Sequence, residues 1–300
     1  MLKRLPTVTF NPWTSRLFNL LMRFIPPAKL PADVLVEVVE VGRLFRPRQP
    51  STTRRAALLW VHGGGRVVGR AMQDDQTCAR LVQALGIPVL SVEYRLAPEH
   101  PFPAALQDCE AAWRWLCEAR ERLGVDHILL AGESAGGGLA AELAQSILDQ
   151  GGLQPLAQIL IYPMLDDRTA LDTGVEPRAH FVWHNDSNRF AWSAYLGERF
   201  GAASLPPYAA AARREDLTGL PAAWIMVGEL DLFYGECVAY HERLRACGVS
   251  SQLYEVPGGF HGMFQMGRDE APVVALWQSM TAFIVERIRL AGGEPLTEDT

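Results

Sequence analysis

The chain has 300 residues, of which 49% are apolar and 21% charged, and its formal net charge is −6. This composition is that of a globular protein with a sizeable core, and it excludes disordered, collagen-like and disulfide-scaffold chains. A mildly acidic chain without a long basic run is also a poor candidate for binding nucleic acid or an anionic membrane surface.

The N-terminal region predicts an amphipathic helix over residues 15–24. Its apolar run, Leu17–Ile25, is interrupted by Asn19 and Arg23 and is followed by no small-residue cleavage site, so we expect no signal peptide. The helical spacing gathers four large apolar side chains on one face: Leu17, Leu20, Leu21 and Phe24. No run in the chain reaches the roughly 18 apolar residues that a membrane span requires, so stable membrane insertion is not expected.

Short apolar runs alternate with helical patterns along the rest of the chain. The predicted strands are Leu35–Val41, Ala57–His62, Pro88–Tyr94, His127–Ala131, Ala157–Tyr162, Ala222–Val227 and Gln252–Val256. The predicted helices are Gln76–Leu85, Ala104–Leu123, Gly136–Asp149, Tyr234–Cys247 and Ala271–Leu290. Several strands are apolar nearly throughout, which is typical of strands buried on both faces of a parallel sheet. The alternation predicts an α/β fold with a mostly parallel central sheet flanked by helices.

Residues 166–220 break this alternation. They are rich in aromatic and polar residues and separate two predicted strands by about sixty positions, a length that is usually functional and often forms a lid. We predict a helix over Ser187–Leu196 and assign residues 166–220, together with residues 1–34, to a helical cap. The catalytic core would then comprise residues 35–165 and 221–300. An insertion that packs away from any site is the alternative.

The five cysteines are scattered, and none forms a Cys-x-x-Cys pair, so zinc binding and thioredoxin-type chemistry have no support. An odd count within predicted helices favours reduced, packed thiols and a cytoplasmic location. We expect neither a metal site nor a cofactor.

A sharp strand-to-helix turn is predicted around Ser134. Residues 127–137 read as strand, turn and helix, with Gly-x-Ser-x-Gly embedded as Gly132-Glu133-Ser134-Ala135-Gly136. The flanking glycines leave room for a strained turn that exposes the serine hydroxyl at the edge of the sheet. Ser134 is the predicted nucleophile, and the N–H of Ala135 would face a developing oxyanion. The alternative is a serine that only caps a glycine-rich helix.

A glycine-rich loop, Gly63-Gly64-Gly65, follows the second predicted strand. Successive glycines can turn their backbone N–H groups toward a negative oxygen, as an oxyanion hole for acyl transfer requires. A flexible loop without a ligand is one alternative. A dinucleotide-binding loop is another, because Glu93 lies near the end of the next strand. However, the Gly-x-Gly-x-x-Gly pattern counted from Gly63 places Val68 where a glycine is needed.

A serine nucleophile needs a base, usually a histidine that a carboxylate orients. The candidates that follow Ser134 are His180, His184, His241 and His261. His261 lies in a glycine-rich turn directly after the strand Gln252–Val256, where a base can reach over the sheet edge. The others fall in the predicted cap or inside a helix. His261 is therefore the predicted base, and a plain loop histidine is the alternative.

Two carboxylates, Glu229 and Asp231, follow the strand Ala222–Val227. They stand between the serine and the histidine in the chain, which is the order serine, acid, histidine. We favour Asp231 because it lies further along the turn, just before the next helix. Glu229 remains the alternative.

Taken together, these motifs resemble those of the bacterial hormone-sensitive-lipase-like carboxylesterases, family IV of the α/β-hydrolases. The matching segments are His62–Gly65 with Gly69, Tyr94–Ala105, Gly132–Gly137, Asp231 and Gly259–Gly262. The resemblance spans about residues 35–290. It implies an α/β-hydrolase fold with a helical cap, an oxyanion hole made of the N–H groups of Gly63, Gly64 and Ala135, and compatibility with a homodimer through paired edge strands. The acid loop departs from the family pattern, with Asp231-Leu-Phe-Tyr-Gly235-Glu236 in place of Asp-Pro-Leu-x-Asp-Glu.

The predicted activity is hydrolysis of a small-molecule ester, with Ser134 attacking, His261 taking its proton and Asp231 holding the imidazole. We expect short to medium acyl chains, because a cap would close a bounded pocket. Aromatic cap residues either line that pocket or only pack the cap: Phe181, Trp183, Phe190, Trp192 and Tyr195. An amidase or N-deacetylase with the same triad is an alternative, as is a non-catalytic ligand-binding relative. Such relatives lack the triad histidine, and this chain has His261.

Overall fold

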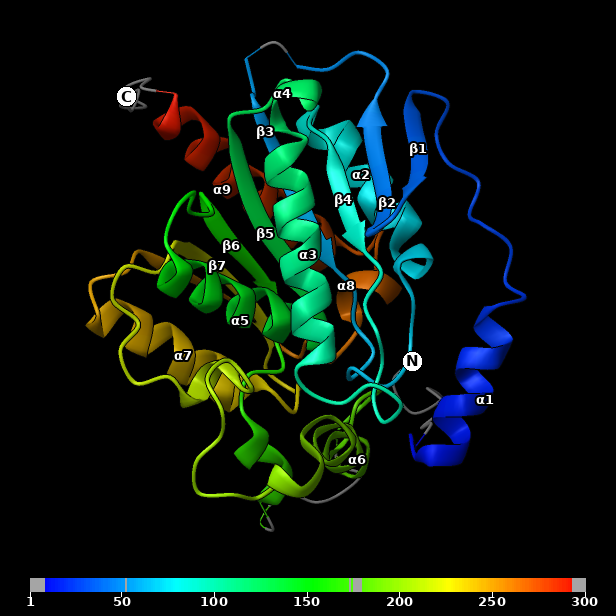
Figure 1. Cartoon of the computed structure of the whole chain (residues 1–300), viewed down its shortest axis with the longest axis vertical. Helices are drawn as coiled ribbons and strands as arrows, with labels where there is room; N and C mark the ends of the chain where they lie inside the picture. Colours follow the sequence, from blue (N-terminus) through cyan, green and yellow to red (C-terminus); the bar gives the residue numbers. More distant parts are fainter. Residues whose placement is uncertain (1–8, 52, 173, 175–179, 293–300) are drawn as a thin grey trace.

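The computed structural model describes residues 9–51, 53–172, 174 and 180–292. Its centre is an eight-stranded sheet in the order β1-β2-β4-β3-β5-β6-β7-β8 (Figure 1). The strands are β1 Val34–Val39, β2 Gly42–Pro47, β3 Ala56–Val61, β4 Val89–Val92, β5 His127–Glu133, β6 Ala157–Ile161, β7 Ala222–Gly228 and β8 Ser251–Val256. The β1–β2 and β2–β4 pairs are antiparallel, and all other neighbours are parallel. The predicted α/β fold with a mostly parallel sheet is confirmed.

The sequence prediction missed one strand. Residues 35–41 were expected to form a single strand, but β1 ends at Val39 and a hairpin returns as β2 from Gly42. Gly42 has a φ of +150°, and a Cβ at this position would lie 2.0 Å from the carbonyl oxygen of Ser91. The backbone of the hairpin therefore approaches β4 more closely than a side chain would allow.

Helices cover both faces of the sheet (Figure 1). The longer helices are α1 Pro12–Met22, α2 Asp75–Leu85, α3 Ala104–Glu118, α5 Ala135–Gln150, α6 Asn185–Leu196, α7 Tyr234–Ala246 and α9 Ala271–Ala291. Shorter ones are α4 Arg120–Leu123, α8 Met263–Met266 and the 3-10 segments Ala71–Asp74, Asp167–Leu171, Gly197–Arg199 and Ala211–Arg213. Helices α2 and α9 contact each other on one face, and α3 and α5 contact each other on the other. The single helix predicted over residues 104–123 is two helices, α3 and α4, separated by Ala119.

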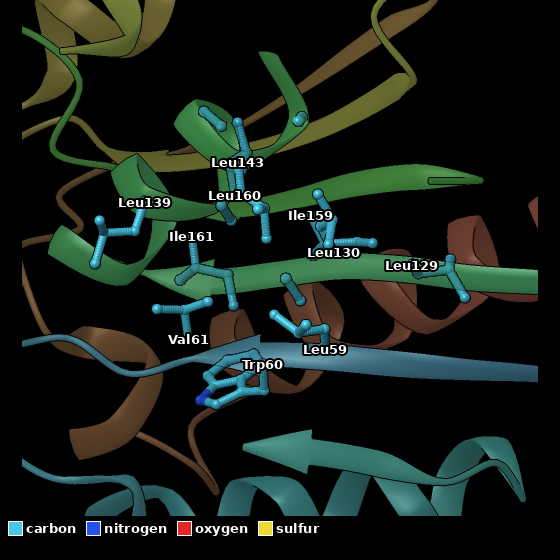
Figure 2. Close-up of a cluster of buried hydrophobic side chains, with 14 of the residues drawn as sticks. Leu59, Trp60, Val61, Leu129, Leu130, Leu139, Leu143, Ile159, Leu160 and Ile161 are labelled. Atoms are coloured by element: carbon cyan, nitrogen blue, oxygen red, sulfur yellow. The ribbon is translucent and has the colours of Figure 1, made fainter. Parts of the chain in front are cut away.

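Helix α5 covers β3, β5 and β6 on one face of the sheet. Figure 2 shows side chains of these elements interdigitating, and all of those it labels are buried: Leu59, Trp60, Val61, Leu129, Leu130, Leu139, Leu143, Ile159, Leu160 and Ile161. Every residue of β3 and of β6 is buried. The continuous apolar runs in the sequence therefore correspond to strands with no solvent-facing side.

The two segments assigned to a cap, residues 1–34 and 166–220, contact each other. The N–H of Phe10 donates to Ser187 Oγ at 3.0 Å, and the rings of Phe10 and Trp183 lie 5.9 Å apart. The first eight residues of the N-terminal segment lie outside the described residues.

Helix α1 forms where it was expected, but its apolar face does not pack on the protein. The side chains of Leu17, Leu20 and Leu21 are all at least half exposed, and Ser15 is the one buried residue of the helix. Periodicity predicted that the apolar side chains share a face and could not predict what this face meets. No helix among the described residues is long and apolar enough to cross a membrane.

Candidate active site

The site forms where the parallel strands end. The turn after β3 carries the glycine loop, the turn after β5 carries Ser134, and the turns after β7 and β8 carry Asp231 and His261. Because the carboxyl ends of parallel strands meet at one edge of the sheet, segments far apart in the sequence converge there.

Ser134 sits on a strained turn. Its φ is +53° and its ψ is −121°, a conformation that costs a residue with a side chain about 1–3 kcal/mol and persists only where the surroundings enforce it. Here the Ser134 N–H donates to the Ile161 carbonyl, and the Ser134 carbonyl accepts from Met164 N–H, both at 2.9 Å. A Cβ at Gly136 would lie 2.1 Å from the Val61 carbonyl oxygen, so the start of α5 packs directly on the end of β3.

The structure brings Ser134, His261 and Asp231 into one hydrogen-bonded chain. His261 Nε2 lies 2.9 Å from Ser134 Oγ, and His261 Nδ1 lies 2.9 Å and 3.1 Å from the two carboxylate oxygens of Asp231. All three residues are buried, with exposed fractions of 3–6%. The carboxylate fixes the tautomer: Nδ1–H donates to Asp231, which leaves Nε2 free to accept the serine proton.

Asp231, and not Glu229, reaches His261. Glu229 instead accepts a hydrogen bond from the Gly258 N–H at 2.9 Å and is exposed. One oxygen of Asp231 also accepts the N–H of Phe233, so the start of α7 holds the carboxylate in place. The unusual acid-loop sequence therefore still supports its carboxylate through the backbone.

Aromatic rings surround the imidazole of His261. The ring of Tyr162 is centred 4.7 Å from it, that of Phe233 5.2 Å and that of Trp183 6.3 Å. Tyr162 Oη donates to the buried carboxylate of Glu133 at 3.2 Å, and Gln265 Nε2 donates to the same oxygen at 2.9 Å. Burial raises the pKa of Glu133, and these two hydrogen bonds oppose the rise. Glu133 thus ties the serine turn to the segment that carries the histidine.

The glycine loop lies beside the serine turn. A Cβ at Gly63 would lie 3.3 Å from the Glu133 carbonyl oxygen, and Gly64 has a φ of +118°. Within the described part of the chain, the N–H groups of Gly63, Gly64 and Ala135 donate to no backbone carbonyl. Three unused donors next to a nucleophile are what an anionic tetrahedral intermediate requires.

The side chain of His62 holds this loop in place. Its Nδ1 lies 2.8 Å from the Gly63 carbonyl, and its ring stacks on Tyr94 with centroids 4.1 Å apart. Burial lowers the pKa of His62 from its ordinary 6.5 to about 4, although the hydrogen bond to Gly63 opposes the shift. The imidazole is therefore neutral at pH 7 and acts as a structural donor.

The buried His62 predicts a loss of stability in mild acid. The unfolded chain takes up a proton at this residue below pH 6.5, whereas the folded chain resists until about pH 4. Between pH 7 and pH 5 this difference lowers the free energy of unfolding by about 2 kcal/mol. In the His62→Asn variant, urea unfolding at the two pH values should show a pH dependence weaker by that amount. An unchanged pH dependence would contradict the assignment, and the exposed His100→Asn variant controls for the loss of a histidine as such.

Arg66, which the sequence analysis did not single out, joins the glycine loop to the cap. It is completely buried, and its Nη2 donates to Glu142 Oε1 at 2.7 Å. Its guanidinium lies 4.5 Å from the ring of Trp192 and 4.2 Å from that of Tyr195, both in α6. Glu142 is the first charged residue of α5 and follows only small and apolar residues. This isolated carboxylate was the one feature of the sequence that could have indicated a buried basic partner.

Asn19 is a second residue whose role the sequence analysis missed. Its amide nitrogen donates to the Val67 carbonyl at 2.9 Å, and its amide oxygen accepts the Gly69 N–H at 3.1 Å. One side chain of α1 therefore binds the backbone of the glycine loop on both sides of Val68. In the sequence this asparagine appears only as an interruption of an apolar run.

The predicted pocket aromatics differ in their placement. Trp183 lies beside His261. A Cβ at Gly65 would lie 2.3 Å from the indole ring of Trp183, so the glycine loop packs closely on this residue. Phe181 packs edge-on against Phe260, the neighbour of His261, at 6.3 Å. Trp192 is fully buried against Arg66, which favours cap packing over pocket lining for this residue. Phe190 is partly buried and packs against the core.

Within the described residues, no cluster of three or more His, Cys, Asp or Glu side chains could hold a metal ion. Other histidines have partners outside the triad. For example, His241 Nδ1 lies 2.8 Å from Ser251 Oγ, and His184 caps α6 through the Ser187 N–H.

Comparison with known proteins identifies the family of this chain. Residues 58–265 match a protein family described by the alpha/beta hydrolase fold. Ethyl acetate hydrolase of Pseudomonas putida is 35% identical over 234 residues, which cover 75% of this chain and 71% of that protein. Esterase LipI of Mycobacterium tuberculosis is 35% identical over 219 residues, which cover 72% and 68%.

Solved structures extend the similarity to nearly the whole chain. A bacterial heroin esterase has a TM-score of 0.84 and 31% identity, with 96% of each chain covered. Esterase LipW of Mycobacterium marinum has a TM-score of 0.79 and 28% identity, with 95% of this chain and 96% of that chain covered. The chain belongs to the α/β-hydrolases and, within them, to the hormone-sensitive-lipase-like carboxylic ester hydrolases.

Proposed function

We propose that this carboxylesterase hydrolyses soluble esters of short to medium acyl chains through an acyl-enzyme on Ser134. The observation that carries the proposal is the continuous chain of contacts from Ser134 Oγ to His261 Nε2, and from His261 Nδ1 to Asp231. No other serine among the described residues has such a base within hydrogen-bond distance of its hydroxyl in a strained strand-to-helix turn.

In the first half of the reaction, Ser134 Oγ attacks the ester carbonyl carbon while its proton moves to His261 Nε2. The carbonyl oxygen becomes negative and accepts hydrogen bonds from the N–H groups of Gly63, Gly64 and Ala135. One donor of this kind is worth about 10²–10³ in kcat. The carbon–oxygen bond of the ester then breaks, and the imidazolium returns its proton to the departing alcohol.

In the second half, water attacks the acyl-enzyme with His261 again as the base. The water proton moves to Nε2 and then to Ser134 Oγ as the acid product leaves. Throughout both halves the Asp231 carboxylate stabilises the imidazolium and holds its orientation, without itself becoming protonated. The chemistry requires only an ester, water and these side chains.

The crowding of aromatic rings from the cap and the core around His261 supports short to medium acyl chains. Trp183 and Phe233 both lie within ring-contact distance of the imidazole, and Phe181 packs on the adjacent Phe260. Aromatic walls of this kind bound the space that is open to an acyl group. The relative named for ethyl acetate is consistent with a small substrate.

The acyl preference is testable with p-nitrophenyl esters from acetate to palmitate. We expect kcat/KM to peak at short chains and to fall steeply towards palmitate, with the Ser134→Ala variant as the blank. Faster hydrolysis of emulsified long-chain triglyceride than of soluble butyrate esters would contradict the bounded pocket. Hydrolysis of an anilide in preference to its matched ester would point to an amidase.

Location and assembly complete the proposal. All five cysteines are free thiols, and three of them are buried, which supports a reducing compartment and hence the cytoplasm. Strand β8 ends the sheet, and its outer edge supports a homodimer in which two such edges pair. Light scattering of the purified chain would show a dimer mass if this assembly forms.

A further inference from the structure

The outer side of α1 and of the three residues after it is an exposed apolar surface. Of the twelve large apolar side chains exposed in the described part of the chain, seven lie here: Trp13, Leu17, Phe18, Leu20, Leu21, Phe24 and Ile25. The exposed fraction reaches 82% at Trp13 and 77% at Phe24. We call these seven residues the outer face of α1. A concentration of apolar surface of this kind marks an interaction site more often than a chance exposure.

Polar contacts on the inner side fix this orientation. Asn19 binds the backbone of Val67 and Gly69, and Arg16 pairs with Glu99 at 3.1 Å. Between α1 and the core lies a groove of about 790 Å³ with charged residues such as Arg70 and Glu93 in its lining. Rolling the helix to bury its apolar side would break these contacts. Leu20, at the margin of the apolar side, lines the groove and stays half exposed. Figure 1 shows α1 at the periphery of the molecule, apart from the sheet.

The charge of the same segment is one-sided. Residues 1–32 contain five basic residues, at Lys3, Arg4, Arg16, Arg23 and Lys29, and no aspartate or glutamate. The chain as a whole has a formal charge of −6, so the segment has the opposite sign to the rest of the molecule. Among the described residues of this segment, Arg16 pairs with Glu99, and Arg23 and Lys29 are exposed. Since charges more than about 8 Å apart are largely screened at physiological salt, a surface in contact with α1 meets mainly these groups. The negative net charge of the whole chain therefore does not describe the charge of this N-terminal segment.

We propose that the outer face of α1 docks on an anionic lipid surface. An amphipathic helix of this kind lies in the plane of the interface, with aromatic and aliphatic side chains below the head groups and basic side chains among them. Arg23 and Lys29 are exposed and flank the apolar surface, where they can meet anionic head groups.

Charge decides against a second copy of the chain as the occupant. A symmetric dimer through this face would place the same patch of each protomer against itself. Two segments without a single acidic residue would then face each other, and like charges in contact are unfavourable. An anionic lipid surface satisfies the apolar face and the basic residues together.

Docking would bring the site close to the lipid surface. Phe10, two residues before α1, lies 5.9 Å from Trp183, which in turn lies 6.3 Å from His261. The interaction itself does not depend on hydrolysis, so its failure and the failure of the esterase proposal would be distinguishable.

Co-sedimentation of the full-length protein with vesicles tests the proposal. We would compare vesicles of phosphatidylcholine with vesicles that contain phosphatidylglycerol, at about 0.1 M and about 1 M salt, where charges are screened beyond roughly 10 Å and 3 Å. The apolar variant is Trp13→Ser/Leu21→Ser/Phe24→Ser, and the charge variant is Arg23→Gln/Lys29→Gln. Val36→Ser/Val38→Ser is the matched control, because it removes exposed apolar side chains from β1 and leaves α1 intact.

We expect binding to the anionic vesicles at low salt, loss of binding in the apolar variant and unchanged binding in the control. The charge variant should bind about 25-fold more weakly, since each of its two basic residues near the surface contributes about fivefold. Hydrolysis of a soluble acetate ester should be unchanged in all variants, which verifies their folding. Absent wild-type binding, or equal binding to both vesicle types at both salt concentrations, would overturn the proposal. A wild-type dimer that the apolar variant converts to a monomer would overturn it in favour of a second copy.

Discussion

The Ser134→Ala and His261→Ala variants are each expected to lose ester hydrolysis by about 10⁶ in kcat, and the double variant should lose no more than either alone. The reason is that the two groups act as one unit: the hydroxyl is a weak nucleophile without the base 2.9 Å away, and the base has no function without the hydroxyl. The residual rate would come from the N–H groups of the glycine loop and from substrate binding.

Steady-state hydrolysis of p-nitrophenyl acetate by the three variants measures this effect. Asp231→Asn is expected to cost less, about 10⁴, because it leaves the nucleophile and base in place but favours the wrong tautomer. Ser250→Ala, at an exposed serine, is the matched control and should retain full activity. Losses that multiply in the double variant would show that Ser134 and His261 act independently and would contradict the mechanism.

The Glu142→Ala variant is expected to lower the free energy of unfolding by about 3–5 kcal/mol. Glu142 and Arg66 are both fully buried and pair at 2.7 Å, so removing the carboxylate leaves a guanidinium without its counter-charge in the interior. The Nε and Nη1 atoms of Arg66 have no hydrogen-bond partner among the described residues, which makes the pair the main compensation for this charge. Burial raises the pKa of Glu142, and the Arg66 guanidinium opposes that rise.

The double variant Arg66→Met/Glu142→Leu separates charge from packing. Because apolar residues of similar size avoid the desolvation of both charges, it should recover most of the stability that Glu142→Ala loses. Urea unfolding monitored by tryptophan fluorescence gives both values, and Asp126→Ala, in an exposed pair with Arg55, is a control expected to have little effect. A double variant no more stable than Glu142→Ala would show that the pair is required for more than charge balance.

The same double variant tests whether Arg66 positions the glycine loop. The Arg66 carbonyl accepts the Ala97 N–H, and its guanidinium packs on Trp192 and Tyr195 of α6. If the stacking of this side chain fixes the neighbouring N–H donors, the variant should have a reduced kcat with little change in KM, even where its stability is restored.

The sequence predicted the residues whose chemistry requires particular neighbours. Glycines on both sides of Ser134, three glycines in the loop and a histidine after the last strand are constraints that local sequence expresses directly. The same holds for β3 and β6, whose continuous apolar runs follow from burial on both sides. The sequence favoured Asp231 over Glu229 from its position in the turn, and the structure shows that the Asp231 carboxylate is the one within hydrogen-bond distance of His261.

What the sequence did not predict depends on contacts between distant segments. Arg66 and Glu142 are 76 positions apart, and nothing local distinguishes a buried arginine from a solvated one. Asn19 binds a loop about fifty positions away, so it appeared only as a break in an apolar pattern. The hairpin at Gly42 was missed because β2 carries two arginines and therefore does not form a continuous apolar run.

Covalent labelling is the most direct test of the central claim that Ser134 is the nucleophile. The wild-type protein would be treated with a p-nitrophenyl phosphonate, and released nitrophenol and the modified peptide would be measured together. The account predicts one equivalent of nitrophenol per active chain, loss of esterase activity in step with labelling, and the adduct on the peptide that contains Ser134. Ser134→Ala should remain unlabelled. Labelling of another residue that accompanies inactivation, or equal labelling of the variant, would contradict the account.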